Sequence, residues 1–262
     1  MNQKLIINAA ITGCVLTKND TPYLPVSVDE IVRCVKILES LGVTIVHLHA
    51  RDDHQAPSYQ AKDYIKLVEA VRAATPDMLI CVSLSGRHES RLEMRAAALQ
   101  SKPEFASLTL GSMNFISGPS INAPDTIQGL AEQIYIANAI PELEVFEAGF
   151  IHYANYLISK KILKPPHYFN LIFGSLGTAP LDLLGLGHMI SMLPTGAVWS
   201  VGGLGQWQLS ANSLAIASGG HVRVGLEDNI YYNKDRTTNN AKRVSDLFLS
   251  VRLKYVTTSP RI

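Results

Sequence analysis

The sequence predicts an α/β fold, a single (β/α)8 barrel of the TIM type, and three observations lead to this prediction. Strand-like and helix-like segments alternate along the chain as eight pairs, with a mean repeat of about 31 residues, the size of one βαβ step. The strand segments are continuous apolar runs, as expected of parallel strands that helices cover. Eight pairs in 262 residues match the usual size of this barrel, so we expect one domain across residues 1–262.

Each pair is an apolar run followed by a segment with helical periodicity. In chain order, the expected strands and helices are 5–12 and 27–41, 44–49 and 62–74, 79–84 and 90–99, 105–110 and 125–139, 143–146 and 149–160, 168–173 and 181–193, 197–201 and 206–218, and 221–224 and 240–254. The first helix begins at Ser27, because Ser27 and Glu30 have the spacing of a capping box. The second ends before Pro76, which disfavours a helical Thr75.

A doubly wound parallel sheet is the alternative fold. It would carry a glycine-rich phosphate loop after its first strand. The segment Thr12-Gly13-Cys14-Val15 is not such a loop, and the barrel is therefore favoured.

Composition narrows the class of protein. Apolar residues make up 47% of the chain, enough for a large core, and only 17% are charged, which favours subunit contacts. The net charge of +1 and the lack of a basic stripe give no indication of nucleic-acid binding. Three cysteines without CxxC spacing indicate a reducing compartment. No signal peptide is expected after Met1, and no apolar stretch reaches the roughly 20 residues that span a bilayer, so we expect a cytoplasmic protein without membrane contact.

The histidine pair His47-Leu48-His49 is the strongest indication of chemistry. It ends an apolar run that reads as a strand, and alternate side chains of a strand leave the same face, about 6–7 Å apart at Cα. Both imidazoles can therefore bind one metal ion. Two partly buried strand histidines bonded to backbone are the structural alternative.

A third ligand is expected from the segment His221-Val222-Arg223-Val224-Gly225-Leu226-Glu227-Asp228-Asn229. In a closed barrel the eighth strand lies beside the first, and the second lies just beyond, so Glu227 can reach the histidine pair. Two histidines and one carboxylate with an open position are typical of catalytic zinc or non-haem iron. Active sites of this fold lie at the carboxyl ends of the strands, where all three residues are expected.

Four segments together resemble the β-keto acid cleavage enzyme family, and the resemblance runs from about residue 5 to residue 254. They are Asn8-Ala9-Ala10-Ile11-Thr12-Gly13, His47-Leu48-His49-Ala50-Arg51, Pro141-Glu142-Leu143-Glu144-Val145-Phe146-Glu147-Ala148-Gly149, and Gly219-Gly220 followed by the segment 221–229. Each stands at an expected strand end. The resemblance implies a zinc-dependent barrel, usually a homotetramer, that condenses a β-keto acid with acetyl-CoA to give acetoacetate and a new acyl-CoA.

The same resemblance implies roles for individual residues. His47, His49 and Glu227 would hold one Zn²⁺ per chain. Asp228 and Arg223 match the pair that handles the proton, and Glu144 matches a further active-site acid. Ser83, Gly86 and Ser107 would stand where the family holds the substrate carboxylate. Apart from the resemblance, Thr109 at a strand end and Val15 in the loop after the first strand are further candidates for substrate binding. Ser107 replaces a threonine of the family.

Three departures from the family pattern concern the substrates. The type member of the family has a glutamate that contacts the ammonium group of its substrate, and Val15 stands at that position here. We therefore expect the substrate of the present protein to have an uncharged far end. Gln206 stands where relatives often have arginine, and the loop 174–178 lacks their glycine- and proline-rich pattern. Both lie where the CoA thioester should pass.

Alternatives remain from other functional classes. A 2-His-1-carboxylate iron enzyme uses the same ligand types, another metal-dependent C–C bond lyase would use the same site, and a non-catalytic relative would bind metal without CoA turnover.

Overall fold

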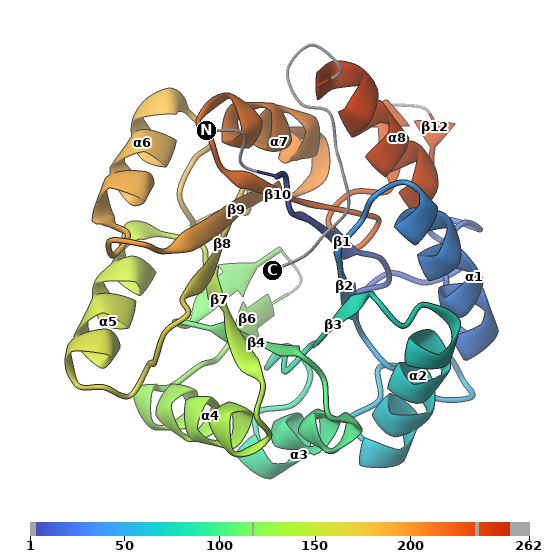
Figure 1. Cartoon of the computed structure of the whole chain (residues 1–262), viewed down its shortest axis with the longest axis horizontal. Helices are drawn as coiled ribbons and strands as arrows, with labels where there is room; N and C mark the ends of the chain where they lie inside the picture. The colour runs from blue at the N-terminus through green and yellow to red at the C-terminus, as the bar shows by residue number, and fades with distance from the viewer. Residues whose placement is uncertain (1–3, 117, 234–235, 252–262) are drawn as a thin grey trace.

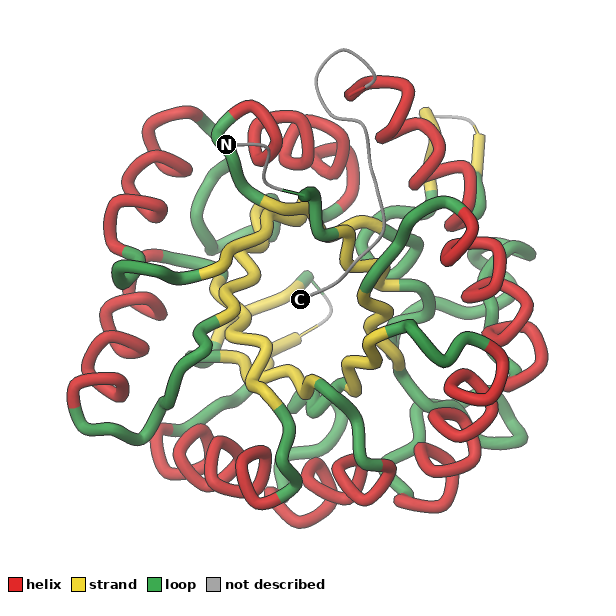
Figure 2. The backbone as a smooth tube through the Cα atoms, viewed as in Figure 1, coloured by secondary structure: helices red, strands yellow, loops and turns green. Residues whose placement is uncertain are grey.

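The computed structural model describes residues 4–116, 118–233 and 236–251. Its eight central strands close into a parallel barrel with the order β1-β10-β9-β8-β7-β4-β3-β2, which confirms the predicted fold. These strands are β1 (Ile7–Ala10), β2 (Ile45–Leu48), β3 (Leu79–Val82), β4 (Phe105–Thr109), β7 (Ile140–Val145), β8 (Tyr168–Phe173), β9 (Val198–Gly203) and β10 (His221–Val224). The strand ring stands inside a ring of helices (Figures 1 and 2).

The outer ring contains eight α-helices among the described residues. They are α1 (Val28–Ser40), α2 (Ala61–Ala74), α3 (Leu92–Ala96), α4 (Pro124–Ile136), α5 (Ala148–Ser159), α6 (Leu183–Met192), α7 (Gln208–Ala217) and α8 (Asn240–Val251). The predicted capping box of α1 is present: the Ser27 hydroxyl accepts from the Glu30 amide at 3.3 Å, and the Glu30 carboxylate accepts from the Ser27 amide at 3.1 Å. None of the described helices has the length and apolarity needed to cross a bilayer.

Short elements supplement the barrel repeat. The 3-10 helices η1 (Ala97–Ser101) and η2 (Gly205–Trp207) stand beside α3 and α7, and two antiparallel hairpins follow barrel strands. These hairpins are β5 (Met113–Phe115) with β6 (Gly118–Ser120), and β11 (Tyr231–Asn233) with β12 (Arg236–Thr237). The hairpin after β4 crosses the barrel opening in Figure 1. The sequence prediction missed both hairpins because their strands are only two or three residues long.

The barrel interior is layered along its axis. Towards the amino ends of the strands it is closed by Ile45, Cys81, Phe105 and Tyr168, which pack in one cluster. The next inward residue of β2 after Ile45 is His47, because side chains alternate across a strand. The outward face of β2, represented by Leu48, belongs to the large core between strands and helices. The floor of the barrel is therefore largely apolar, and polar side chains begin above it.

Candidate active site

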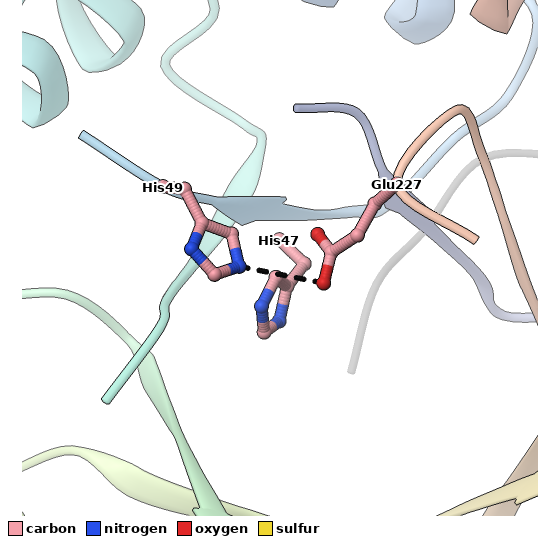
Figure 3. A group of neighbouring side chains, drawn as sticks. All are labelled: His47, His49 and Glu227. Carbon is pink, nitrogen blue, oxygen red and sulfur yellow. Dashed lines mark ion pairs between the residues drawn. The ribbon is translucent and has the colours of Figure 1, made fainter. Parts of the chain in front are cut away.

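The two histidines leave β2 on its inner face, as the spacing predicts. His47 is 1% exposed and His49 5% exposed, while Leu48 between them faces the helices and is fully buried. The imidazole centroids lie 5.2 Å apart. Figure 3 shows both rings turned towards Glu227.

Glu227 lies in the loop after β10. Strand β10 pairs with β1, and β1 pairs with β2. This strand order is the one that the barrel prediction required. The Glu227 amide donates to the Ala10 carbonyl at 3.1 Å, which ties the loop to β1. Gly13, with φ +69°, stands against the Glu227 side chain, and a Cβ there would lie 2.8 Å from Glu227 Cγ. A glycine is therefore required both by the backbone conformation and by the space that Glu227 occupies.

His47, His49 and Glu227 are suited to hold a metal ion. Each offers one ligand atom, and these atoms all lie within 4.8 Å of one another. His49 Nε2 lies 3.4 Å from Glu227 Oε1, and within the described part of the chain neither His49 Nε2 nor Glu227 Oε2 has a hydrogen-bond partner. Buried polar atoms are rarely left without partners. Two nitrogens and a carboxylate are a donor set that zinc accepts.

Glu142 lies behind His47, on the side away from this cluster. His47 Nδ1 lies 2.8 Å from Glu142 Oε2, so His47 Nε2 remains for a metal. Burial opposes the charged form of His47, but Glu227 and Glu142 outweigh it and raise its pKa to about 8. Burial lowers the pKa of His49 more than Glu227 raises it. The two imidazoles therefore differ: the nearby carboxylates favour a proton on His47, whereas burial disfavours one on His49.

A hydrogen-bond network fixes the Glu142 carboxylate. Its Oε1 accepts from the Asn170 amide at 3.0 Å and from Asn8, and its Oε2 accepts from the Cys81 thiol at 3.1 Å. Burial opposes its charge, but His47 and Arg223 hold its pKa at about 2. The sequence analysis did not assign Glu142 a role. Its spacing of two from Glu144 on one strand, the same signal as in the histidine pair, could have identified it.

Arg223 and Asp228 form a bidentate pair beside the cluster. Arg223 Nε donates to Asp228 Oδ2 at 2.9 Å, Nη2 donates to Oδ1 at 3.1 Å, and Nη2 also contacts Glu227 Oε1 at 2.9 Å. Burial raises the pKa of Asp228, against the opposing effect of Arg223. Arg223 thus links the candidate base to the candidate ligand Glu227.

Glu144 faces the same space from β7. Its Oε2 accepts from the Thr109 hydroxyl at 2.7 Å, and its Oε1 lies 3.7 Å from Arg223 Nη1. Burial and the nearby Glu142 carboxylate raise its pKa. Glu144 is therefore poised to hold a proton more readily than Glu142.

A pocket opens over these residues, and most of the predicted site residues line it. They are Val15, His47, His49, Ser83, Thr109, Glu144, Arg223, Glu227 and Asp228. Two of the predicted substrate-binding residues, Ser107 and Gly86, do not line the pocket. The Ser107 hydroxyl accepts from the Leu84 amide at 3.1 Å, and a Cβ on Gly86 would lie 2.9 Å from Arg95 Nη1. These two residues shape the loop after β3.

The pocket also contains two residues that the sequence analysis did not single out, Arg87 and Phe115. The Arg87 guanidinium stacks on the Phe115 ring, 3.5 Å from its centroid. Arg87 comes from the loop after β3, whereas Phe115 is on β5. No sequence pattern joins them, because the stacking exists only once the β5–β6 hairpin has folded over the barrel end.

Comparison with known proteins agrees with the sequence resemblance. The model of the beta-keto acid cleavage enzyme family matches residues 4–252. A 3-keto-5-aminohexanoate cleavage enzyme of Fusobacterium nucleatum is 35% identical over 237 residues, which cover 89% of this chain and 86% of the relative. A 3-oxoadipate:acetyl-CoA acetyltransferase of Cupriavidus necator is 32% identical over 251 residues, which cover 94% and 88% of the two chains.

A solved structure agrees with the fold. The apo structure of ObcA superposes with a TM-score of 0.79 at 21% identity and covers 91% of this chain. This chain spans 64% of the ObcA chain. At this identity the likeness concerns the barrel architecture alone.

Proposed function

The chain belongs to the β-keto acid cleavage enzyme family, and on that premise we propose that it transfers the acyl group of a β-keto acid to CoA. The substrates would be the keto acid R–CO–CH₂–COO⁻ and acetyl-CoA, and the products would be acetoacetate and R–CO–CoA. The observation that carries the proposal is the juxtaposition in one pocket of a three-ligand cluster and the Arg223–Asp228 pair.

The metal would be one Zn²⁺ per chain, held by His47, His49 and Glu227. The donor set and the unpartnered His49 Nε2 and Glu227 Oε2 atoms support this assignment. When bound, zinc would supply a Lewis acid for the keto oxygen of the substrate.

Asp228 would act as the base. Its buried carboxylate, whose pKa is raised by that burial, is suited to take a proton from the carbon between the keto and carboxylate groups. That carbon then forms a bond to the acetyl carbon of acetyl-CoA, and the bond between this acetyl carbon and sulfur breaks, which releases CoA thiolate. The thiolate adds to the original keto carbon, and the bond from that keto carbon to the deprotonated carbon breaks, which gives R–CO–CoA and leaves the electron pair on the carbon that becomes the CH₂ of acetoacetate. The proton returns to the same carbon in acetoacetate, so the reaction consumes none.

Arg223 would be a positioning residue for Asp228. Its two hydrogen bonds fix the plane of the carboxylate, and a bidentate contact adds geometric precision to an ion pair. Glu144, also within reach of Arg223, would be the further acid of the site.

The substrate carboxylate would lie towards Ser83 and Thr109, which line the pocket. Ser107 and Gly86 would act by shaping the loop after β3 rather than by direct contact. The active unit would be a homotetramer.

An isotope experiment tests the proposal. Zinc-loaded protein is incubated with acetyl-CoA carrying ¹³C in both acetyl carbons and with each of three six-carbon acids: 3-oxohexanoate, 3-oxoadipate and 3-keto-5-aminohexanoate. Mass spectrometry should find the label in acetoacetate and an unlabelled new CoA ester. Label that stays in the thioester with every acid, or metal binding without any new ester, would contradict the proposed reaction and favour a non-catalytic relative.

A further inference from the structure

Two arginines line the pocket, Arg87 and Arg223. Among residues 4–116, 118–233 and 236–251, no group accepts a hydrogen bond from the Arg87 guanidinium. Within these ranges its guanidinium forms no ion pair or hydrogen bond, and its contact is the stack on Phe115 at 3.5 Å. The donors of Arg223, the other arginine that lines the pocket, and of Arg51, which does not line it, are occupied. Arg223 binds carboxylates, and Arg51 donates to three backbone carbonyls, those of Gly13, Leu16 and Gln55.

Stacking orients Arg87 without neutralising it. A ring over the guanidinium face is a favourable contact for the cation, and it leaves the N–H donors, which lie in the guanidinium plane, directed sideways. The Phe115 ring is itself held edge-on by Phe146, with centroids 5.7 Å apart. Arg87 is therefore a pre-oriented cation with free donors, the arrangement that binds carboxylate or phosphate oxygens.

Arg87 and Val15 line the same pocket, and neither is fully buried: Arg87 is half-buried and Val15 is exposed. Burial raises the pKa of the Cys14 thiol, the residue before Val15, and the charge of Arg87 acts in the opposite direction. Val15 lines the pocket and is 43% exposed, whereas His47 is 1% and Asp228 8% exposed. The reacting end of a substrate must reach the buried residues, and its far end therefore points towards Val15 and Arg87.

We propose that Arg87 binds an anionic group at the far end of the β-keto acid, so that the preferred substrate is a keto diacid. The inference rests on the proposed function for the identity of the reacting end. It keeps one part of the expectation from Val15, that an amine is disfavoured, and replaces the other part: a terminal carboxylate is favoured over the uncharged end that Val15 alone indicates. CoA phosphates are the other source of anionic oxygens near this cation.

Direct binding tests the inference independently of turnover. Isothermal titration without acetyl-CoA compares 3-oxoadipate with 3-oxohexanoate, which differ only in the terminal carboxylate. The wild-type protein should bind the diacid about 10- to 150-fold more tightly, the range for a hydrogen bond to a charged group. Arg87→Met, which keeps the stem beside Phe115, should remove this difference and leave 3-oxohexanoate binding unchanged.

Arg91→Met is the matched control. Arg91 is in the same loop, its side chain is 66% exposed, and it pairs with Glu89. This variant should keep the preference for the diacid, and kcat/KM for the two acids should follow the binding data in all three proteins.

Three results would overturn the inference. One is equal binding of the two acids by the wild-type protein, and another is an equal loss for both in Arg87→Met. The third concerns CoA. In this result Arg87→Met keeps the diacid preference, but its KM rises for acetyl-CoA and not for S-acetylpantetheine, which lacks the phosphates. Arg87 would then bind the CoA phosphates. The binding and isotope experiments separate the two proposals. If the wild-type protein transfers the ¹³C label to acetoacetate but shows no preference for the diacid in the titration, only the role of Arg87 is rejected. A diacid preference without label transfer rejects only the proposed reaction.

Discussion

The buried Glu142 carboxylate should orient His47, one of the proposed metal ligands. Its hydrogen bond with His47 Nδ1 fixes the ring orientation and leaves Nε2 for the metal. We expect Glu142→Gln to weaken Zn²⁺ binding by about 10- to 100-fold, the usual effect of removing such a partner. Competition with a chromophoric chelator measures the affinity, and Glu132→Gln on the exposed face of α4 is the control. An unchanged affinity in Glu142→Gln would show that His47 needs no support.

A second prediction concerns the proposed metal ligands. Purified protein should carry close to one zinc per chain, and His47→Ala/His49→Ala or Glu227→Gln should lose most of it, because water cannot replace a protein ligand without loss of the site geometry. Elemental analysis by mass spectrometry measures the metal, with the exposed loop variant His54→Ala as control. Full occupancy in the double variant would place the metal elsewhere.

Asp228 can be separated from the metal site by a conservative change. Asp228→Asn keeps the size of the side chain but cannot accept the substrate proton, so kcat should fall by at least about a hundredfold while the zinc content is maintained. Steady-state assays alongside metal analysis give both values. Unchanged turnover would transfer the role of base to Glu144.

Sequence information located the site better at some residues than at others. The spacing of His47 and His49 and the position of Glu227 after the last strand predicted a cluster that the structure assembles. The same spacing in Glu142 and Glu144 was overlooked because Pro141 masks the start of β7. Arg87 offered no signal, since its stacking partner comes from another loop.

At the scale of elements, strong local signals were predictive and weak ones were not. The strands at 168–173 and 221–224 have the predicted bounds, and the capping box set the start of α1. The fifth barrel strand, β7, begins at Ile140 rather than at residue 143. The sequence predicted a later start because proline is unusual within a paired strand, yet β7 contains Pro141. The predicted helix 90–99 is a short α-helix followed by η1. The end predicted for the last helix, residue 254, lies outside the described residues.

The join between β10 and the start of the chain should give the protein an acid sensitivity. His221 Nδ1 accepts from the Ile6 amide at 3.1 Å, and burial lowers the pKa of His221 to about 4. The unfolded chain takes up this proton below about pH 6.5, whereas the folded chain does not until about pH 4. The contribution of neutral His221 to the free energy of unfolding is therefore fully present above pH 6.5 and is lost as the pH falls towards 4. At pH 4.5 the loss is about 2.5 kcal/mol.

The variant His221→Asn isolates this effect. It should be less stable than the wild type at pH 7.5, and the difference in unfolding free energy should shrink or reverse by pH 4.5. Denaturant titrations at several pH values measure the difference. A difference in His221→Asn that does not vary with pH would contradict the assignment.

At the scale of the whole molecule, the closed strand order follows from length and repeat alone, whereas the assembly has to be measured. Leu183 and Leu184 at the start of α6 are 75% and 84% exposed, and apolar side chains at such exposure favour burial against another chain. We expect a homotetramer, with a mass four times the 28.6 kDa of the chain, in sedimentation velocity experiments.

The leucines provide a test of where subunits meet. Leu183→Asp/Leu184→Asp should shift the sedimenting species to a smaller assembly, because an interface cannot bury the new carboxylates without a large desolvation cost. Glu132→Gln again serves as the control. A wild-type protein that sediments as a monomer at micromolar concentration would contradict the expected assembly.

The pairing of β1 with β10 brings the first and last strands of the barrel together, and it has a consequence for synthesis on the ribosome. The segment with both histidines is translated about 180 residues before Glu227. A nascent chain can therefore display the imidazoles but cannot complete the three-ligand cluster until the segment after β10 has left the exit tunnel. A metal ion held as proposed would therefore contact all three side chains only after this segment has emerged, and its presence would mark chains whose barrel has closed.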